Sequence, residues 1–246
     1  MDSYSEFANL YDDLMRDFDY EKWFNYIEEI FMKYNIIPKN ILEMACGTGN
    51  LSYFLGNRGY RLTCFDLSSD MLSKAYEKLR RFKNVKILKQ DMVNFNFDKS
   101  FNAIISVCDS INYITDLENL NKTFNNVWKH LDDDGIFIFD VNSYYKLKNI
   151  IGNNIFVEDR KGIFYTWQNQ FDENNNISSF YLTFFHGLDG VNYVRFDEEH
   201  RQRAYTVEEI VSSLKKAGFR TVDYYDAFSF DNPKIHSERI NFVAIK

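Results

Sequence analysis

Strand-like and helix-like segments alternate along residues 20–142, and this alternation limits the possible folds more than any other feature of the sequence. Short apolar runs that suit buried strands lie at 40–44, 60–65, 85–88, 101–107 and 135–141. Apolar residues recur at helical spacing in the segments beside these runs, at 20–34, 50–57, 69–81 and 117–131. Such alternation is typical of a parallel sheet whose strands are joined by crossover helices.

The same pattern returns near the C-terminus. Thr206 and Glu209 have the spacing of a capping box, and Gly218 is placed to end the helix that we expect at 207–217. Two further strands are expected at 221–230 and 240–246. The sequence therefore predicts an α/β fold with a seven-stranded, mostly parallel sheet that carries helices on both faces.

Residues 143–204 interrupt the pattern, because they contain no clear amphipathic helix. They contain three aromatic runs with strand-like alternation, GIFYTWQNQF, ISSFYLTFFHG and VNYVRFDEEH, joined by the turn-rich segments DENNN and GLDG. We expect a small antiparallel β insertion that covers the carboxyl edge of a domain made of 1–142 and 205–246. Its apolar face should include some of six residues: Phe164, Trp167, Phe171, Phe180, Phe184 and Phe185.

Charge and composition narrow the possible partners. The net charge is −7 and the pI is about 5.2, which disfavours a nucleic acid whose affinity would come from phosphate neutralisation. Because no apolar run is long enough to cross a bilayer and the N-terminus lacks a signal sequence, we expect a cytoplasmic protein with no membrane partner. Cys46, Cys64 and Cys108 lie in or beside strand-like runs, which predicts buried reduced thiols and no metal site.

The strongest local signal is the turn that contains Gly47 and Gly49, between a predicted strand and a predicted helix. Glycines there let a ligand approach the backbone, and Asp66 ends the next strand, where an acid can bind the hydroxyls of a ribose. This fits a dinucleotide dehydrogenase or a protein that binds a nucleoside sulfonium. Ser52 stands where a pyrophosphate site needs a third small residue, and Glu43 suits a cation better than a pyrophosphate, so NAD is disfavoured.

Four segments together resemble the class I, Rossmann-like S-adenosylmethionine-dependent methyltransferases of the small-molecule type. They are ILEMACGTGN, Asp66-Leu67-Ser68 with Met71-Leu72, Gln90-Asp91-Met92 and LDDDGIFIFDV. The resemblance covers the chain apart from its N-terminal segment and the insertion. It implies S-adenosylmethionine as the cofactor.

The resemblance also implies a set of cofactor-binding positions. Asp66 would bind the ribose diol, Leu67 would pack on adenine, and Asp91 would accept a hydrogen bond from the adenine amino group. The full set is Tyr11, Glu43, Ala45, Cys46, Gly47, Gly49, Asp66, Leu67, Asp91, Met92, Cys108 and Asp109. Trp23 is a weaker candidate of the same kind as Tyr11.

Several of these residues also have structural explanations. Asp66 could cap the following helix, Asp91 could form a turn, and Tyr11 could be an ordinary packing aromatic. Similarly, His200, Arg201 and Arg203 could bind an anionic acceptor or form a solvated charged surface; His186 is more typical of a structural or solvent-facing histidine.

We therefore expect an enzyme that transfers a methyl group to a small-molecule acceptor. Alternatives are a methyltransferase acting on protein or RNA, another nucleotide-binding enzyme, or a cofactor-binding protein without turnover. Since the cofactor supplies the leaving group, no catalytic residue is assigned, and Tyr11, Asp109 and His200 are only candidate bases. The sequence leaves nitrogen, oxygen and carbon acceptors open.

Overall fold

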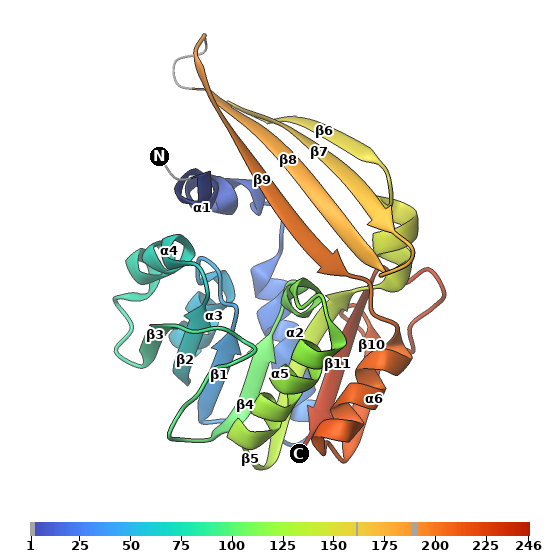
Figure 1. Ribbon diagram of the computed structural model, residues 1–246. Helices are drawn as coiled ribbons and strands as arrows, with labels where there is room; N and C mark the ends of the chain where they lie inside the picture. The colour runs from blue at the N-terminus through green and yellow to red at the C-terminus, as the bar shows by residue number, and fades with distance from the viewer. Residues whose placement is uncertain (1–2, 161, 188–190) are drawn as a thin grey trace.

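The computed structural model describes residues 3–160, 162–187 and 191–246, which form two β-sheets and the helices around them (Figure 1). The helices are α1 (Ser3–Leu14), α2 (Tyr20–Lys33), α3 (Asn50–Arg58), α4 (Ser69–Leu79), α5 (Leu117–His130) and α6 (Val207–Ala217), with a 3₁₀ turn η1 (Ser110–Tyr113) and a π-helical segment η2 (Lys146–Ile151). No helix in this described part of the chain is long and apolar enough to span a membrane.

The large sheet has seven strands in the order β10-β11-β5-β4-β1-β2-β3. They are β1 (Asn40–Met44), β2 (Arg61–Asp66), β3 (Val85–Lys89), β4 (Phe101–Ser106), β5 (Leu131–Asn142), β10 (Thr221–Asp226) and β11 (Arg239–Ile245). Neighbouring strands from β3 to β5 pair in parallel, whereas β11 is antiparallel to both β5 and β10. The predicted seven-stranded, mostly parallel Rossmann-like sheet is confirmed.

Helices cover both faces of the large sheet, as the sequence predicted. Apolar side chains of α5 and α6 pack on one face, and those of α2, α3 and α4 pack on the other. Local signals account for the helix ends: Thr206 and Glu209 form the predicted capping box, and Gly218 closes α6 with a left-handed φ of 110°. This packing places the carboxyl ends of β1, β2 and β4 at one edge.

The small sheet lies over that edge (Figure 1). It consists of β6 (Ile155–Arg160), β7 (Ile163–Asp172), β8 (Ile177–Gly187) and β9 (Tyr193–Arg203), all paired antiparallel in chain order. The antiparallel insertion is thus confirmed. The sequence missed β6 and also η2, so the expectation of no helix in 143–204 was wrong at 146–151; six residues carry too little periodicity to be recognised.

The strand register separates the six aromatic residues that were expected to share a face. Trp167, Phe171, Phe180 and Phe184 lie on the inner face of the small sheet, which faces the rest of the protein, while Phe164 and Phe185 pair with each other on the outer face. Consecutive strand residues point to opposite sides, so Phe184 and Phe185 cannot share a face.

The N-terminal helix α1, which the sequence did not predict, fills part of the space beneath the small sheet. Its Leu10 packs with Ile163, Phe184 and Phe196, one residue from each of β7, β8 and β9. The contact buries an apolar surface that neither the helix nor a single four-stranded sheet could bury alone. Therefore α1 and the small sheet stabilise each other.

The two faces of β8 give a matched pair of variants. Phe184 is fully buried, whereas Phe185 is partly exposed. We predict that Phe184→Ala lowers the free energy of unfolding by about 3–5 kcal/mol through the cavity it leaves, and that Phe185→Ala costs less than about half of that. Chemical denaturation measures both. Equal losses would contradict the assignment of the faces.

Candidate active site

The turn between β1 and α3 has a backbone that favours glycine. Ala45, Gly47 and Gly49 have left-handed φ angles of 52°, 55° and 78°. A Cβ on Gly49 would lie 2.9 Å from Leu79 Cδ1 of α4, whereas a Cβ on Gly47 would meet no heavy atom of the described residues within 4 Å. Gly49 therefore allows α3 to pack closely against α4, and Gly47 leaves the backbone open to a ligand.

Asp66 ties this turn to the end of β2. Its Oδ2 accepts from the Gly47 amide at 2.8 Å and its Oδ1 from the Ser68 amide at 2.9 Å. The N-cap of α4 is Ser68, whose side chain accepts from the Met71 amide, so Asp66 is not the cap. The Leu67 amide also interacts with this carboxylate, whose remaining acceptor capacity is available to a hydroxyl, and the Leu67 side chain is 64% exposed.

Glu43 lies buried behind the glycine turn. The hydroxyl of Ser52 in α3 donates to its Oε2 at 2.5 Å, which explains the serine that stands in place of a third glycine. Burial, together with the nearby Asp66 carboxylate, raises the pKa of Glu43 to about 8, although the hydrogen bond from Ser52 opposes the shift. Cys46 lies close to both acids. A hydrogen bond with Cys64, together with burial, raises the pKa of the Cys46 thiol.

The turn after β3 contains Asp91 and Met92. Asp91 Oδ1 accepts from the Val93 amide at 2.9 Å, so this side chain does form the turn that the sequence suggested. Met92 is half-buried and packs against the core beneath α5. The turn lies on the same edge of the sheet as Asp66, because β3 is parallel to β2.

The turn after β4 is held by buried charges. Cys108 and Asp109 both have left-handed φ angles, 62° and 53°. The Asp109 amide donates to Asp140 Oδ2 at 3.0 Å, and Arg239 donates to both Asp140 and Asp109 Oδ1, the latter at 2.8 Å. Gln202 of β9 donates to the remaining Asp109 oxygen at 2.7 Å. With both oxygens engaged, Asp109 is poorly placed to act as a base.

Asp12 joins helix α1 to the glycine turn and to α4 through hydrogen bonds and an ion pair. This carboxylate accepts from Thr48 Oγ1 at 2.6 Å, Asn50 Nδ2 at 2.9 Å and Lys78 Nζ at 3.1 Å. Burial alone would raise the pKa of Asp12, but these hydrogen bonds and the Lys78 charge outweigh it and lower the pKa. Asp12 was not identified from the sequence, because the helix that carries it was not.

Tyr11 lies on the same helix, near Tyr20, Cys108 and Tyr113. Burial, together with these neighbours, raises the pKa of its hydroxyl well above the usual value, so Tyr11 is a neutral phenol that can form hydrogen bonds but not a phenolate base. Trp23, the weaker candidate, is 1% exposed and packs in the core against Phe228. Its position supports the packing explanation.

His200 of β9 lies beneath the small sheet, with its ring centroid 5.5 Å from that of Phe7 and 5.9 Å from that of Tyr113. Burial lowers its pKa, so the imidazole is neutral at pH 7. Arg201 and Arg203 lie on the opposite face of β9 from His200, because successive strand residues point to opposite sides, and Arg203 forms an ion pair with Glu209 at 2.9 Å. The three basic side chains therefore do not converge on one anion.

Comparison with known proteins agrees with this geometry. A family model described as a methyltransferase domain matches residues 41–135. The putative methyltransferase YqeM of Bacillus subtilis (strain 168) is 35% identical over 99% of this chain and 97% of its own length. The crystal structure of a S-adenosylmethionine-dependent methyltransferase from Clostridium acetobutylicum is 40% identical, with a TM-score of 0.89 and 99% of each chain covered.

The chain belongs to the S-adenosylmethionine-dependent methyltransferases. The predicted enzyme class and cofactor are confirmed, and the dehydrogenase alternative is excluded. The sugar N-methyltransferase KedS8 from Streptoalloteichus shares the fold at 18% identity, with a TM-score of 0.77 over 94% of this chain and 90% of that chain.

The raised pKa of Glu43 leads to a prediction about how stability depends on pH. A carboxyl whose pKa rises on folding takes up a proton when the chain folds, so its contribution to stability is complete below its ordinary pKa and is lost as the pH rises through about 8. We expect the melting temperature of the ligand-free protein to fall from pH 5 to pH 9 relative to that of Glu43→Gln. Each kcal/mol gained by the variant corresponds to roughly 2–4 °C at this chain length.

Scanning calorimetry at several pH values measures this difference. Glu77→Gln, which removes a largely exposed carboxyl from α4, is the control and should follow the wild type. Parallel curves for the wild type and Glu43→Gln would show that Glu43 is ionised in the folded protein.

Proposed function

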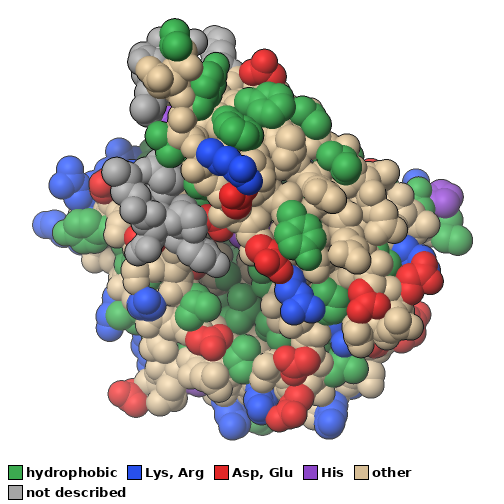
Figure 2. Space-filling view, turned by 45° about the horizontal axis from the view of Figure 1, so that its top comes forward, with side chains coloured by type: hydrophobic (Ala, Val, Ile, Leu, Met, Phe, Trp, Pro, Cys, Tyr) green, Lys and Arg blue, Asp and Glu red, His purple; other side chains and the backbone are tan. Residues whose placement is uncertain are grey.

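We propose that this methyltransferase modifies a small molecule held between the large sheet and residues 143–204, which act as the lid on the acceptor side. The single observation that carries the proposal is the position of the small sheet over the carboxyl edge where Gly47, Asp66 and Cys108 meet. Figure 2 shows a hollow between the two sheets with hydrophobic side chains at its floor. A hollow of this kind suits a small acceptor better than a folded macromolecule.

The names of similar proteins agree with a small acceptor. A Streptomyces venezuelae enzyme that is 28% identical over 41% of this chain is named as an N,N-dimethyltransferase of a dTDP-linked amino sugar. KedS8, which shares the fold, is a sugar N-methyltransferase. The acidic pI is a further argument against RNA as the acceptor.

We assign cofactor binding to the residues around the glycine turn. S-adenosylmethionine supplies a methyl group activated by its sulfonium sulfur. Asp66 accepts hydrogen bonds from the ribose, the exposed Leu67 covers the adenine, and Gly47 leaves room for the methionine portion. Glu43 and Cys46 lie behind this turn, and Cys108 and Tyr11 lie on its other side.

His200 is the best-placed of the three candidate bases. Tyr11 stays protonated and Asp109 is engaged by Arg239 and Gln202, whereas His200 is neutral and faces the space beneath the small sheet. A neutral imidazole there can accept a proton from an acceptor.

The cofactor assignment is tested with Asp66→Ala. Hydrogen bonds from the ribose to a carboxylate are lost, so the dissociation constant of S-adenosylhomocysteine should rise at least about tenfold, because one charge-assisted bond alone contributes about 1.5–3 kcal/mol. Isothermal titration calorimetry measures the affinity. Asp70→Ala, on the first turn of α4, is the control and should bind normally. A change below about threefold in Asp66→Ala would contradict the ribose role.

The acceptor class is tested by following a labelled methyl group. We predict that the purified protein transfers label from S-adenosylmethionine into the small-molecule fraction of a cell extract. After separation by filtration, protein and RNA should carry label no higher than in a reaction with heat-inactivated enzyme. Enzyme-dependent label in protein or RNA would overturn the small-molecule proposal while leaving the methyltransferase assignment intact.

A further inference from the structure

Four buried polar atoms on the inner face of the small sheet have no hydrogen-bond partner among the described residues. They are Trp167 Nε1, Asn169 Oδ1, Ser178 Oγ and Glu198 Oε1. The register puts all four side chains on one face. Trp167 and Glu198 share a row through Leu182, Asn169 lies in the next row, and Ser178 lies in the row after that. Buried polar groups are nearly always satisfied, so this concentration on one face indicates groups that await a ligand.

Of these four side chains, Glu198 is the one whose burial without a partner costs the most free energy. It is only 5% exposed, and within the described ranges it forms no ion pair with any lysine, arginine or histidine. Among the buried carboxylates of residues 3–160, 162–187 and 191–246, Asp140 also has an orphaned oxygen, but its second oxygen is paired with Arg239. An isolated buried carboxylate is costly, and an apolar residue would serve packing better at this position.

The inner face runs from Glu198 toward the cofactor edge. His200 follows two residues later on the same face and contacts Tyr113, and Gln202 follows two residues after that and donates to Asp109. Alternate residues on a strand lie about 7 Å apart, so Glu198 lies about 13 Å along β9 from Gln202. A small acceptor can span this distance from the cofactor edge.

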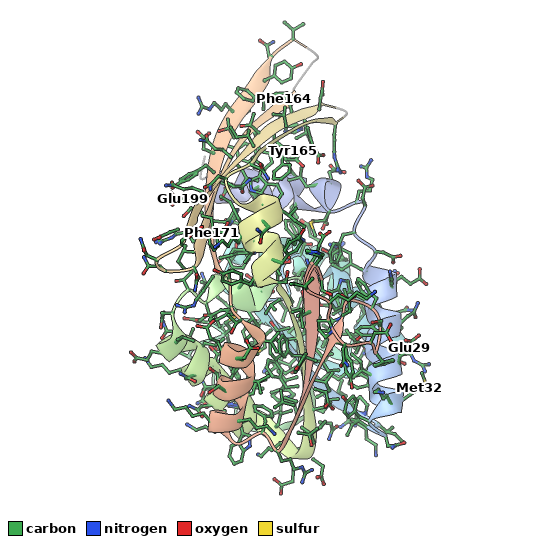
Figure 3. All side chains as sticks on the ribbon, turned by 90° about the vertical axis from the view of Figure 1, so that its right-hand side faces the viewer. Glu29, Met32, Phe164, Tyr165, Phe171 and Glu199 are labelled. Atoms are coloured by element: carbon green, nitrogen blue, oxygen red, sulfur yellow. The ribbon has the colours of Figure 1, made fainter. Side chains whose placement is uncertain are left out.

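Aromatic side chains surround these polar groups. Trp167 and Phe180 pack edge to face with centroids 5.5 Å apart, and Tyr165 and Phe184 pair in the next row. In Figure 3, Tyr165 lies on the side of the sheet that faces α1, while Glu199 projects from the opposite side. Aromatic faces attract cations, which adds to the charge of Glu198.

We propose that the inner face of the small sheet binds an acceptor through an amino group, which Glu198 receives as an ammonium. An ammonium has three donors and no acceptor, and Glu198 supplies the unpaired acceptor oxygen that receives it, while Asn169 and Ser178, one and two rows nearer the cofactor edge, offer oxygens to other donors of the same acceptor. An anionic acceptor is repelled by Glu198, and an uncharged alcohol leaves the charge of Glu198 unpaired. This inference rests on the proposed small-molecule function and names the chemistry of the acceptor.

Binding of simple amines tests the site. With the enzyme saturated with S-adenosylhomocysteine, hexylamine and glucosamine should bind at least tenfold more tightly than hexanol and glucose, as measured by titration calorimetry. Glu198→Gln should lose this preference at least tenfold and keep its affinity for S-adenosylhomocysteine. Glu199→Gln, which changes the adjacent exposed carboxylate on the outer face, should behave like the wild type. Equal binding of amines and alcohols to the wild type would overturn the proposal, as would an unchanged preference in Glu198→Gln.

Two further measurements separate this inference from the proposed function. In the absence of ligand, Glu198→Leu should melt at a higher temperature than the wild type, since it removes an unpaired buried carboxylate; a lower melting temperature would reveal a structural partner and overturn the inference. Mass spectrometry should identify the labelled product as a small molecule that carries an amino group in addition to the methylated atom. A labelled small molecule without an amino group would overturn the inference and keep the proposed function. Label in protein or RNA would overturn the proposed function, and the amine titration would still decide the role of Glu198.

Discussion

The arrangement of the site depends on one buried cation, Arg239. It stands at the start of β11 and donates to Asp140 at the end of β5 and to Asp109 after β4. Two carboxylates share this single guanidinium. Burial raises the pKa of Asp140 to about 6, Arg239 opposes the shift, and the charge of Asp109 adds to it. Removal of the arginine would leave two buried carboxylates unpaired, a change that typically costs about 3–5 kcal/mol.

This charge group joins parts of the chain that are distant in sequence. Asp140 accepts from the Asp109 amide and thereby supports a backbone that is left-handed at Cys108 and Asp109. Gln202 binds the same Asp109 from β9, so the small sheet is attached at the point where the cofactor-side turn is fixed. The antiparallel β11 makes this possible, because it brings its first residue to the edge where the parallel strands end.

Local patterns predicted the parts of this structure that depend on neighbours in sequence. Apolar periodicity located every strand of the large sheet, and the capping box of Thr206 located α6. Helix α1 was missed because its stability comes from contact with the small sheet, as Leu10 shows. The roles of Arg239 and Gln202 could not be inferred either, since pairing across more than ninety residues leaves no signal in one sequence.

The polar groups differ between the two halves of the site. Around the glycine turn they satisfy one another: Glu43 accepts from Ser52, and Asp66 accepts from two backbone amides. On the inner face of the small sheet Glu198 and Asn169 have orphaned oxygens. A site whose polar groups are already paired is preorganised, which suits the glycine turn to a single cofactor. A site with unpaired polar groups, such as the inner face of the small sheet, binds most tightly the ligand whose groups pair with them. Under the proposed function, discrimination between acceptors belongs to β7, β8 and β9, where a substitution can change the preferred acceptor without disturbing the glycine turn.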